Sequence, residues 1–303
     1  MEICLSGLLF DQRQPDELAQ AARRNGYGAV ELRGTRNQLP PDAPVERAAQ
    51  LAEILNGLPV VNIATHVGNF ALLDAADTRA QTDLALKYIG WARQLDRASV
   101  RLWPGWIASN EADPTHWTRA AQALRRCAEA GATDGVRIAI EMHHGTLADC
   151  ATGAMRLLDA IDHPAVGLVF DPANLMQTPA PFGPNALGPI WDRLLHVHVK
   201  DHAFAGTDEP GAYPFRDYLR HIGQWVPDMR LPRRRLGPAR YAKRLLGAGD
   251  VPWPAILREL NARDYAGTLI IESEQGPGMP AGDQLATREF RTLRAWLDAL
   301  ASA

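Results

Sequence analysis

The sequence predicts an α/β fold, a (β/α)8 TIM barrel with an extended loop insertion after the seventh strand. Eight short apolar, β-branched runs alternate with longer amphipathic stretches, which is the pattern of strands joined by helices. The 303 residues, 46% of them hydrophobic, suffice for one barrel with a sizeable core. A doubly wound sheet is the alternative, but the phosphate loops GxGxxG and GxxxxGK(S/T) that often accompany it are missing. We therefore expect a single domain over residues 1–303.

Each predicted strand is a short run rich in apolar and β-branched side chains. In chain order, these runs are Ile3–Phe10, Ala29–Arg33, Val60–His66, Ser99–Trp103, Val136–Met142, Val166–Phe170, Leu195–Lys200 and Thr268–Glu272.

The predicted helices lie between these strands. Several begin near a proline and end just before a glycine, which is the usual asymmetry of helix ends. The predicted helices are Pro15–Asn25, Pro44–Asn56, Asp77–Leu95, Thr115–Ala130 with Gly131 after it, Thr152–Ile161, Trp253–Ala262 and Asp283–Ala299, with Asn185–Arg193 as a weaker pattern.

A long insertion separates Lys200 from Trp253. Its residues, 201–252, exceed what a minimal barrel needs, and they include a basic run from Arg230 to Arg244. Loops that follow barrel strands lie on the face where barrel active sites form. We therefore expect the insertion to cover the catalytic face as a lid, an oligomer contact or both. A solvated surface explains the basic run equally well.

The overall charge and the cysteines exclude several classes of protein. The net charge of -3 gives no general attraction to nucleic acid or to an anionic membrane. Cys4, Cys127 and Cys150 are odd in number and far apart, so we expect no disulfide framework and a cytoplasmic location. The first residues, MEICLSGLLFDQRQPDE, lack the basic start of a signal peptide, and no run of about 18 apolar residues predicts a membrane span.

An ionisable residue closes each of the last four predicted strands. These residues are Glu141, Asp171, His198 and Glu272. The carboxyl ends of barrel strands meet at one mouth, where a buried carboxylate is costly unless it is paired or bound to metal. Three carboxylates and one imidazole suit a hard or borderline divalent cation. We therefore expect one divalent metal ion, with Mn2+ as the first choice and Mg2+ or Co2+ as alternatives.

The seventh strand, within L-L-H-V-H-V-K-D-H, turns three polar residues to one face. They are His196, His198 and Lys200, which alternate with apolar residues. His196 lies deeper than His198, so we expect a histidine satisfied by its neighbours. Lys200, at the rim, is a candidate catalytic residue that holds a substrate oxygen or stabilises a developing enolate. A salt bridge to Asp201 or Glu272 is the structural alternative.

Other residues near the strand ends are candidates for substrate binding. They are His66, Arg101, Trp103, His143 and Asn174. Trp103 is also typical of a packed wall, and only one of the adjacent His143 and His144 can face inward.

Glu31 and Arg33 close the second strand. Glu31 is a further candidate for lining the pocket, and an ion pair between the two residues at the rim is the structural alternative.

Several segments resemble the xylose-isomerase-like TIM-barrel superfamily, and in particular its sugar phosphate isomerase/epimerase branch. They are G-Y-G-A-V-E-L-R, I-E-M-H-H-G, F-D-P-A-N-L, H-V-H-V-K-D, G-A-G-D-V-P-W-P-A-I-L-R-E-L and G-T-L-I-I-E, and they cover nearly the whole chain. The resemblance implies that Glu141, Asp171, His198 and Glu272 are metal ligands. It also implies that the two glutamates flank the substrate and move protons.

Three positions depart from the ketose 3-epimerases of that superfamily. Leu147 stands where they carry a second glutamate, Asn174 where they carry a histidine, and Phe204 where they carry an arginine. The resemblance therefore implies that the substrate pocket for free ketoses is not preserved. Members similar to inosose dehydratase or hydroxypyruvate isomerase, and keto-sugar lyases, remain open.

These observations predict a divalent-metal-dependent isomerase or epimerase of a sugar or keto-sugar. The reaction would remove a proton next to a carbonyl, with Glu141 or Glu272 as base, and form a metal-stabilised enediolate. A dehydratase or other lyase on the same scaffold is the first alternative, and a non-catalytic binding barrel is the second. We expect a small carbohydrate as the ligand, possible self-association and no nucleic acid. The abasic-site endonucleases of the superfamily use more histidine ligands, and their substrate favours a basic surface.

Overall fold

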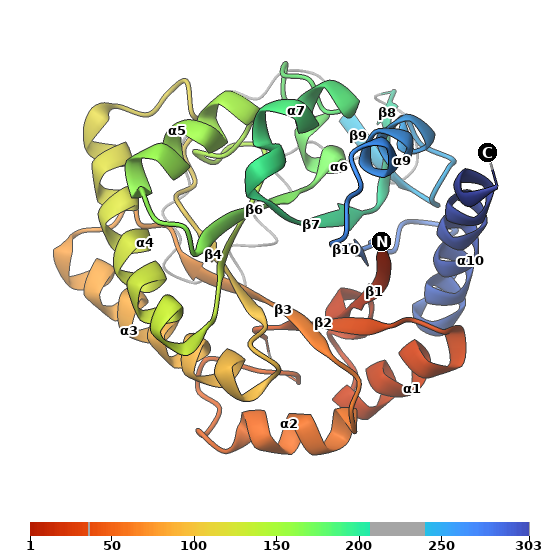
Figure 1. The fold of residues 1–303 in the computed structure, drawn as a ribbon, viewed down its shortest axis with the longest axis horizontal. Helices are drawn as coiled ribbons and strands as arrows, with labels where there is room; N and C mark the ends of the chain where they lie inside the picture. Colours follow the sequence, from red (N-terminus) through yellow and green to blue (C-terminus); the bar gives the residue numbers. More distant parts are fainter. Residues whose placement is uncertain (36, 207–239, 303) are drawn as a thin grey trace.

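The computed structural model, which describes residues 1–35, 37–206 and 240–302, confirms the closed (β/α)8 barrel (Figure 1). Its strands follow the order β1-β10-β7-β6-β5-β4-β3-β2, and β1 closes the ring by pairing in parallel with both β10 and β2. The barrel strands are β1 (Glu2–Ser6), β2 (Ala29–Arg33), β3 (Val60–Gly68), β4 (Ser99–Trp103), β5 (Ile138–Glu141), β6 (Val166–Phe170), β7 (Leu194–Val199) and β10 (Thr268–Ile271).

Helices form a ring outside the strands (Figure 1). The apolar side chains that they turn inward pack with the outward-facing strand residues into one large hydrophobic core. The helices are α1 (Pro15–Asn25), α2 (Arg47–Leu55), α3 (Ala75–Gln94), α4 (Pro114–Asp134), α5 (Ala151–Ile161), α6 (Pro172–Leu175), α7 (Leu187–Ile190), α9 (Trp253–Ala262) and α10 (Gly282–Ala301).

The first predicted strand is too long. Ile3–Phe10 divides at Ser6, because Gly7–Phe10 forms a 3-10 helix whose start is capped by the Ser6 hydroxyl, which accepts the Leu8 N–H at 3.3 Å. Phe10 lies in the core and Leu9 packs against it. A short apolar run is compatible with a strand as well as with a 3-10 helix, so the pattern of apolar residues did not distinguish them.

Two of the predicted helices also need correction. The helix predicted at Thr115–Ala130 continues to Asp134 and ends at Gly135, which has a φ of +72°. Gly131 lies inside α4 against the Val136 carbonyl. The weak pattern at Asn185–Arg193 is divided into a 3-10 turn, the short α7 and a second 3-10 turn.

The insertion begins as an antiparallel pair of strands outside the barrel. β8 (Asp201–Ala205) pairs with β9 (Arg240–Arg244). Most of the basic run and the centre of the insertion, residues 207–239, lie outside the described residues, so its role as a cover or an oligomer contact stays a prediction.

A buried carboxylate fixes the base of the insertion. Asp201 accepts the N–H groups of Gly247 at 2.9 Å, Gly249 at 3.1 Å and Val251 at 3.3 Å. Gly249 passes so close that an added Cβ would lie 2.1 Å from Asp201 Oδ1. Glu289 of α10 holds the next turn by accepting the Leu246 N–H at 3.0 Å.

Within the described residues, the longest helices are too polar to cross a bilayer. The three cysteines are free, with Cys4 and Cys127 buried.

The buried Glu289 predicts a pH dependence of stability. Burial raises the pKa of Glu289 to about 7, and the charge of Asp201 acts in the same direction. Because the pKa is higher in the folded state than its ordinary value of 4.5, this contribution to stability is complete below about pH 4.5 and is lost as the pH rises through about 7. The variant Glu289→Gln carries an amide, which stays uncharged at both pH values. Urea unfolding at pH 5 and pH 8 should therefore show the variant gaining stability relative to the wild type at the higher pH, and a constant difference would contradict the assignment.

Candidate metal centre

The four predicted ligands come together at the carboxyl mouth of the barrel. Glu141 is the last residue of β5, Asp171 follows β6, His198 lies near the end of β7 and Glu272 follows β10. These strands are neighbours in the closed sheet, so their ends meet although the residues are far apart in sequence. Asp171 is also the N-cap of α6, where its Oδ1 accepts the Asn174 N–H at 2.9 Å, which fixes its direction.

One imidazole nitrogen faces all three carboxylates. His198 Nδ1 lies 3.2 Å from Glu272 Oε2, 3.5 Å from Asp171 Oδ2 and 3.6 Å from Glu141 Oε1. One candidate ligand atom from each of the four residues lies within 4.8 Å of the others, and all four residues are buried. Within the described chain, His198 Nδ1 is buried without a hydrogen-bond partner. A buried nitrogen facing three oxygens fits a divalent cation with mixed oxygen and nitrogen ligands.

The other nitrogen of His198 is held by Glu31. His198 Nε2 lies 3.2 Å from Glu31 Oε2, and Glu31 accepts hydrogen bonds of 2.7 Å from both Ser6 Oγ and Asn62 Nδ2. Glu31 is fully buried, so the expected rim ion pair between Glu31 and Arg33 is wrong. A carboxylate on the far nitrogen orients a histidine and fixes which nitrogen is free to bind metal.

Arg33 lies nearer the rim than Glu31. Its guanidinium is 4.0 Å from both Asp11 and Glu272, and 3.1 Å from the Nε2 atom of His66. Within the described residues, the buried His66 Nδ1 has no hydrogen-bond partner. Burial, with the charges of Arg33 and Arg101, lowers the pKa of His66 well below its ordinary value, so the ring is neutral at pH 7.

The charges of the cluster shift the pKa of its members strongly. Burial alone would lower the pKa of His198, but Glu272, Glu31 and Glu141 raise it well above its ordinary value. Burial alone would raise the pKa of Glu272, but His198 and Lys200 hold it well below its usual range. Glu272 is therefore ionised at neutral pH, and a bound cation would compete with a proton for His198.

Two cations partly neutralise the acids. Arg101 forms a buried ion pair with Glu141 and lies 3.7 Å from Glu272. Lys200 Nζ lies 2.7 Å from Asp171 and 2.8 Å from Glu272, so the predicted alternative of a salt bridge to Glu272 is present and that to Asp201 is not. Burial would lower the pKa of Lys200, but Asp171 and Glu272 raise it well above its ordinary value, and the side chain is a cation rather than a base.

The remaining candidate residues line the same mouth beside Glu141. Asn174 Nδ2 donates to Glu141 at 2.7 Å and to Asp171 at 2.8 Å. His143 meets the edges of Trp103 and Trp106, whose rings stack on each other at 4.6 Å. Trp103 is buried and donates to the Thr65 carbonyl at 3.0 Å, so it forms a wall, while His143 and His144 are both buried.

The family model of xylose isomerase-like TIM barrels matches residues 19–299. This chain belongs to that family.

Three known proteins illustrate the likeness. An inosose dehydratase from Clostridium perfringens is 25% identical over 166 residues, which cover 54% of this chain and 49% of that protein. A probable 3-DHS dehydratase from Bacillus anthracis has 18% identity, covers 97% of this chain and 99% of its own, and has a TM-score of 0.73. A family member from Mycobacterium smegmatis, solved in complex with magnesium, has 16% identity, coverage of 99% and 97%, and a TM-score of 0.70. The chain spans about half the length of the curated relatives it matches, and at these identities the two structures show a shared fold.

Sequence reasoning named Glu31 as a residue near the pocket but missed its contact with His198. A weak signal was available, because Glu31 and Arg33 are two apart on one strand and therefore share a face, with Glu31 one layer deeper. The same reasoning placed His196 below His198, yet it could not show which strand would supply the partner of His198.

The contact between Glu31 and His198 predicts a loss of metal affinity in Glu31→Gln. The amide is uncharged and a weaker acceptor, so we expect Mn2+ to bind about 10- to 100-fold more weakly, as measured by isothermal titration calorimetry. Glu289→Gln makes the same change at an equally buried glutamate that contacts Leu246 instead, and should bind Mn2+ as the wild type does. Equal affinity of Glu31→Gln and the wild type would show that Glu31 has no such role.

Proposed function

We propose that this protein is a divalent-metal-dependent enzyme that removes a proton next to the carbonyl of a small polyhydroxylated ketone and then eliminates water. The observation that carries the proposal is His198 Nδ1, which is buried without a hydrogen-bond partner among the described residues and faces three carboxylates at 3.2–3.6 Å. A barrel that only binds a partner does not need three carboxylates gathered around one buried imidazole nitrogen.

Glu141, Asp171, His198 and Glu272 are the proposed ligands of the metal. A bound divalent ion supplies a Lewis acid that polarises the substrate carbonyl. We keep Mn2+ as the first choice, and the magnesium complex of a family member makes Mg2+ the next. Imidazole and carboxylate ligands suit both ions.

Glu272 is the better candidate for the base. Both oxygens of Glu141 are engaged, one by Arg101 and the other by Asn174. Glu272 receives one short hydrogen bond, from Lys200 to Oε2, while its Oε1 lies 3.7 Å from Arg101 and 4.0 Å from Arg33. Oε1 is therefore the freer atom for accepting a proton.

Lys200 is the proposed general acid for the leaving hydroxyl. Its ammonium, held by Asp171 and Glu272, can donate a hydrogen bond to a hydroxyl on the carbon beyond the one that loses the proton. Glu272 takes the proton of the C–H bond, whose electron pair forms a C=C bond as the C–O bond breaks. The leaving hydroxyl takes a proton from Lys200 and departs as water, and the proton on Glu272 returns to Lys200 through their contact. His66, through its free Nδ1, is the proposed contact for another substrate hydroxyl.

We place dehydration before isomerisation for two reasons. Asn174 and Leu147 stand where the ketose 3-epimerases carry histidine and glutamate, and Asn174 is used here to hold Glu141 and Asp171. The sequence relatives and one structural neighbour are named dehydratases. Isomerisation or epimerisation is the second candidate, since two glutamates in one site can remove and return a proton.

Replacing either glutamate should abolish most of the activity. We expect Glu272→Gln and Glu141→Gln each to lower kcat by at least about 10²–10⁴-fold, because proton transfer is lost. Metal content measured in the same samples separates loss of the base from loss of the ion. The exposed Glu53→Gln on α2 is the control and should leave kcat unchanged. Near-normal turnover in Glu272→Gln would refute its assignment as the base.

The reaction class can be read from NMR spectra in D2O. The Mn2+-loaded protein is incubated with a keto-inositol, a 3-keto-glycoside and a free ketose, and the ion is removed before the spectra are recorded. Dehydration predicts a new vinylic product and loss of water. Deuterium incorporation without elimination would instead establish an isomerase or epimerase, and no change in any substrate would contradict both candidates.

A further inference from the structure

Polar side chains take part of the place of the usual apolar filling inside the barrel. Interior positions of such barrels are normally filled by branched apolar residues. Here Glu31 of β2, Asn62 of β3, Ser99 of β4 and His196 of β7 lie inside, and Thr268 of β10 joins them.

These residues form one continuous chain of hydrogen bonds. Thr268 Oγ1 lies 2.6 Å from His196 Nδ1, and His196 Nε2 lies 2.9 Å from Ser99 Oγ. Ser99 Oγ lies 2.7 Å from Asn62 Oδ1, and Asn62 Nδ2 lies 2.7 Å from Glu31 Oε2. We call these five residues the polar column; it ends on the carboxylate that contacts His198. As expected, His196 is satisfied by its neighbours.

The chemistry of each group sets the direction of the column. The Glu31 carboxylate only accepts, so Asn62 must turn its NH2 group toward it and its carbonyl oxygen toward Ser99. Ser99 gives its single hydroxyl proton to that oxygen, because the competing Val61 carbonyl is farther away at 3.2 Å.

The histidine then follows from Ser99. His196 Nε2 must donate to the Ser99 oxygen, which leaves His196 Nδ1 to accept from Thr268. A neutral ring has one N–H and one acceptor nitrogen, which matches these two contacts. Every donor along the column therefore points toward Glu31.

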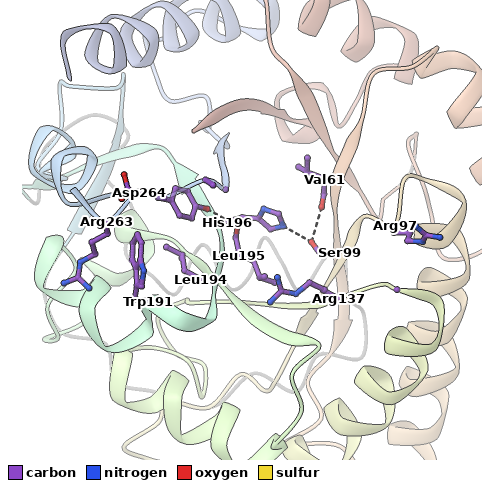
Figure 2. A pocket seen from close by; sticks show the side chains of 14 residues that line it. Val61, Arg97, Ser99, Arg137, Trp191, Leu194, Leu195, His196, Arg263 and Asp264 are labelled. Carbon is purple, nitrogen blue, oxygen red and sulfur yellow. Dashed lines mark hydrogen bonds between the residues drawn. The ribbon is translucent and has the colours of Figure 1, made fainter. Parts of the chain in front are cut away.

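The far end of the column lies at the opposite mouth of the barrel. Ser99 and His196 line a hollow of about 530 Å³ formed at the starts of the strands, with Val61 and Arg137 nearby (Figure 2). The column thus joins the wall of this hollow to the metal centre through the barrel interior.

We propose that Asn62, Ser99, His196 and Thr268 are positioning residues that act through Glu31 to present His198 Nδ1 to the metal. Successive hydrogen bonds in a buried chain polarise one another, so the donors aligned on Glu31 hold its carboxylate in place and favour its ionised form, in which it accepts the His198 Nε2–H. This inference rests on the metal centre of the proposed function, and it adds residues that do not touch metal or substrate.

The test is the affinity of the metal-depleted protein for Mn2+, measured by calorimetry. Removing one hydrogen bond should weaken binding about two- to tenfold. We expect the effect to decrease with distance from Glu31, in the order Asn62→Ala, Ser99→Ala, Thr268→Val, and Ser99→Thr should restore affinity. Thr82→Val removes a buried hydroxyl on α3 that donates to the Thr78 carbonyl, and should bind Mn2+ as the wild type does.

A second measurement does not depend on whether Ser99→Ala folds. Two-bond ¹H–¹⁵N spectra of the Mg2+-loaded wild type should show His196 and His198 as neutral rings with the proton on Nε2. A proton on Nδ1 of His196 would reverse the direction of the column and overturn the proposal.

The outcomes separate this inference from the proposed function. If the column variants bind Mn2+ as the wild type does while Glu141→Gln loses it, the column has no positioning role and the metal centre stands. If the wild type binds no divalent ion, both proposals fall.

Discussion

Mutual repulsion among three carboxylates is the constraint around which the mouth of this barrel is built. Glu141, Asp171 and Glu272 meet at one imidazole nitrogen in a buried site, where like charges interact far more strongly than in water. Arg101 and Lys200 offset part of this repulsion from the sides. A proton on His198 offsets the rest, and a divalent cation that takes its place would hold the three carboxylates together.

Barrel closure supplies the geometry that this arrangement needs. Parallel strands in register bring the ends of β5, β6, β7 and β10 to one level, although their residues span more than a hundred positions. Local hydrogen bonds then orient individual side chains and the backbone near them. The turn of helix after β6 holds Asp171 as its N-cap, and Trp253 of α9 donates to the Lys200 carbonyl at 3.0 Å, which fixes the chain where β7 ends.

The sequence predicted those features that depend on periodicity and on position along a strand. Alternating apolar runs predicted the barrel, and Glu141, Asp171, His198 and Glu272 stood out because each closes an apolar strand. The sequence did not predict contacts between residues that are far apart along the chain. The partner of His198 is Glu31, 167 positions earlier, and the direction of the polar column follows only when Asn62, Ser99 and His196 are seen together. Local ambiguity explains the errors at Gly7–Phe10 and at the end of α4, where apolar content or a glycine was compatible with two conformations.

The way in which the insertion is attached bears on how its length affects the stability of the barrel. Asp201 holds the returning chain at Gly247, Gly249 and Val251, so both ends of the excursion are fastened at one point beside the barrel. For a flexible loop, each doubling of length between fastened ends costs only about 0.6 kcal/mol of closure entropy. The number of residues between these fastened ends can therefore change at little cost to the stability of the barrel.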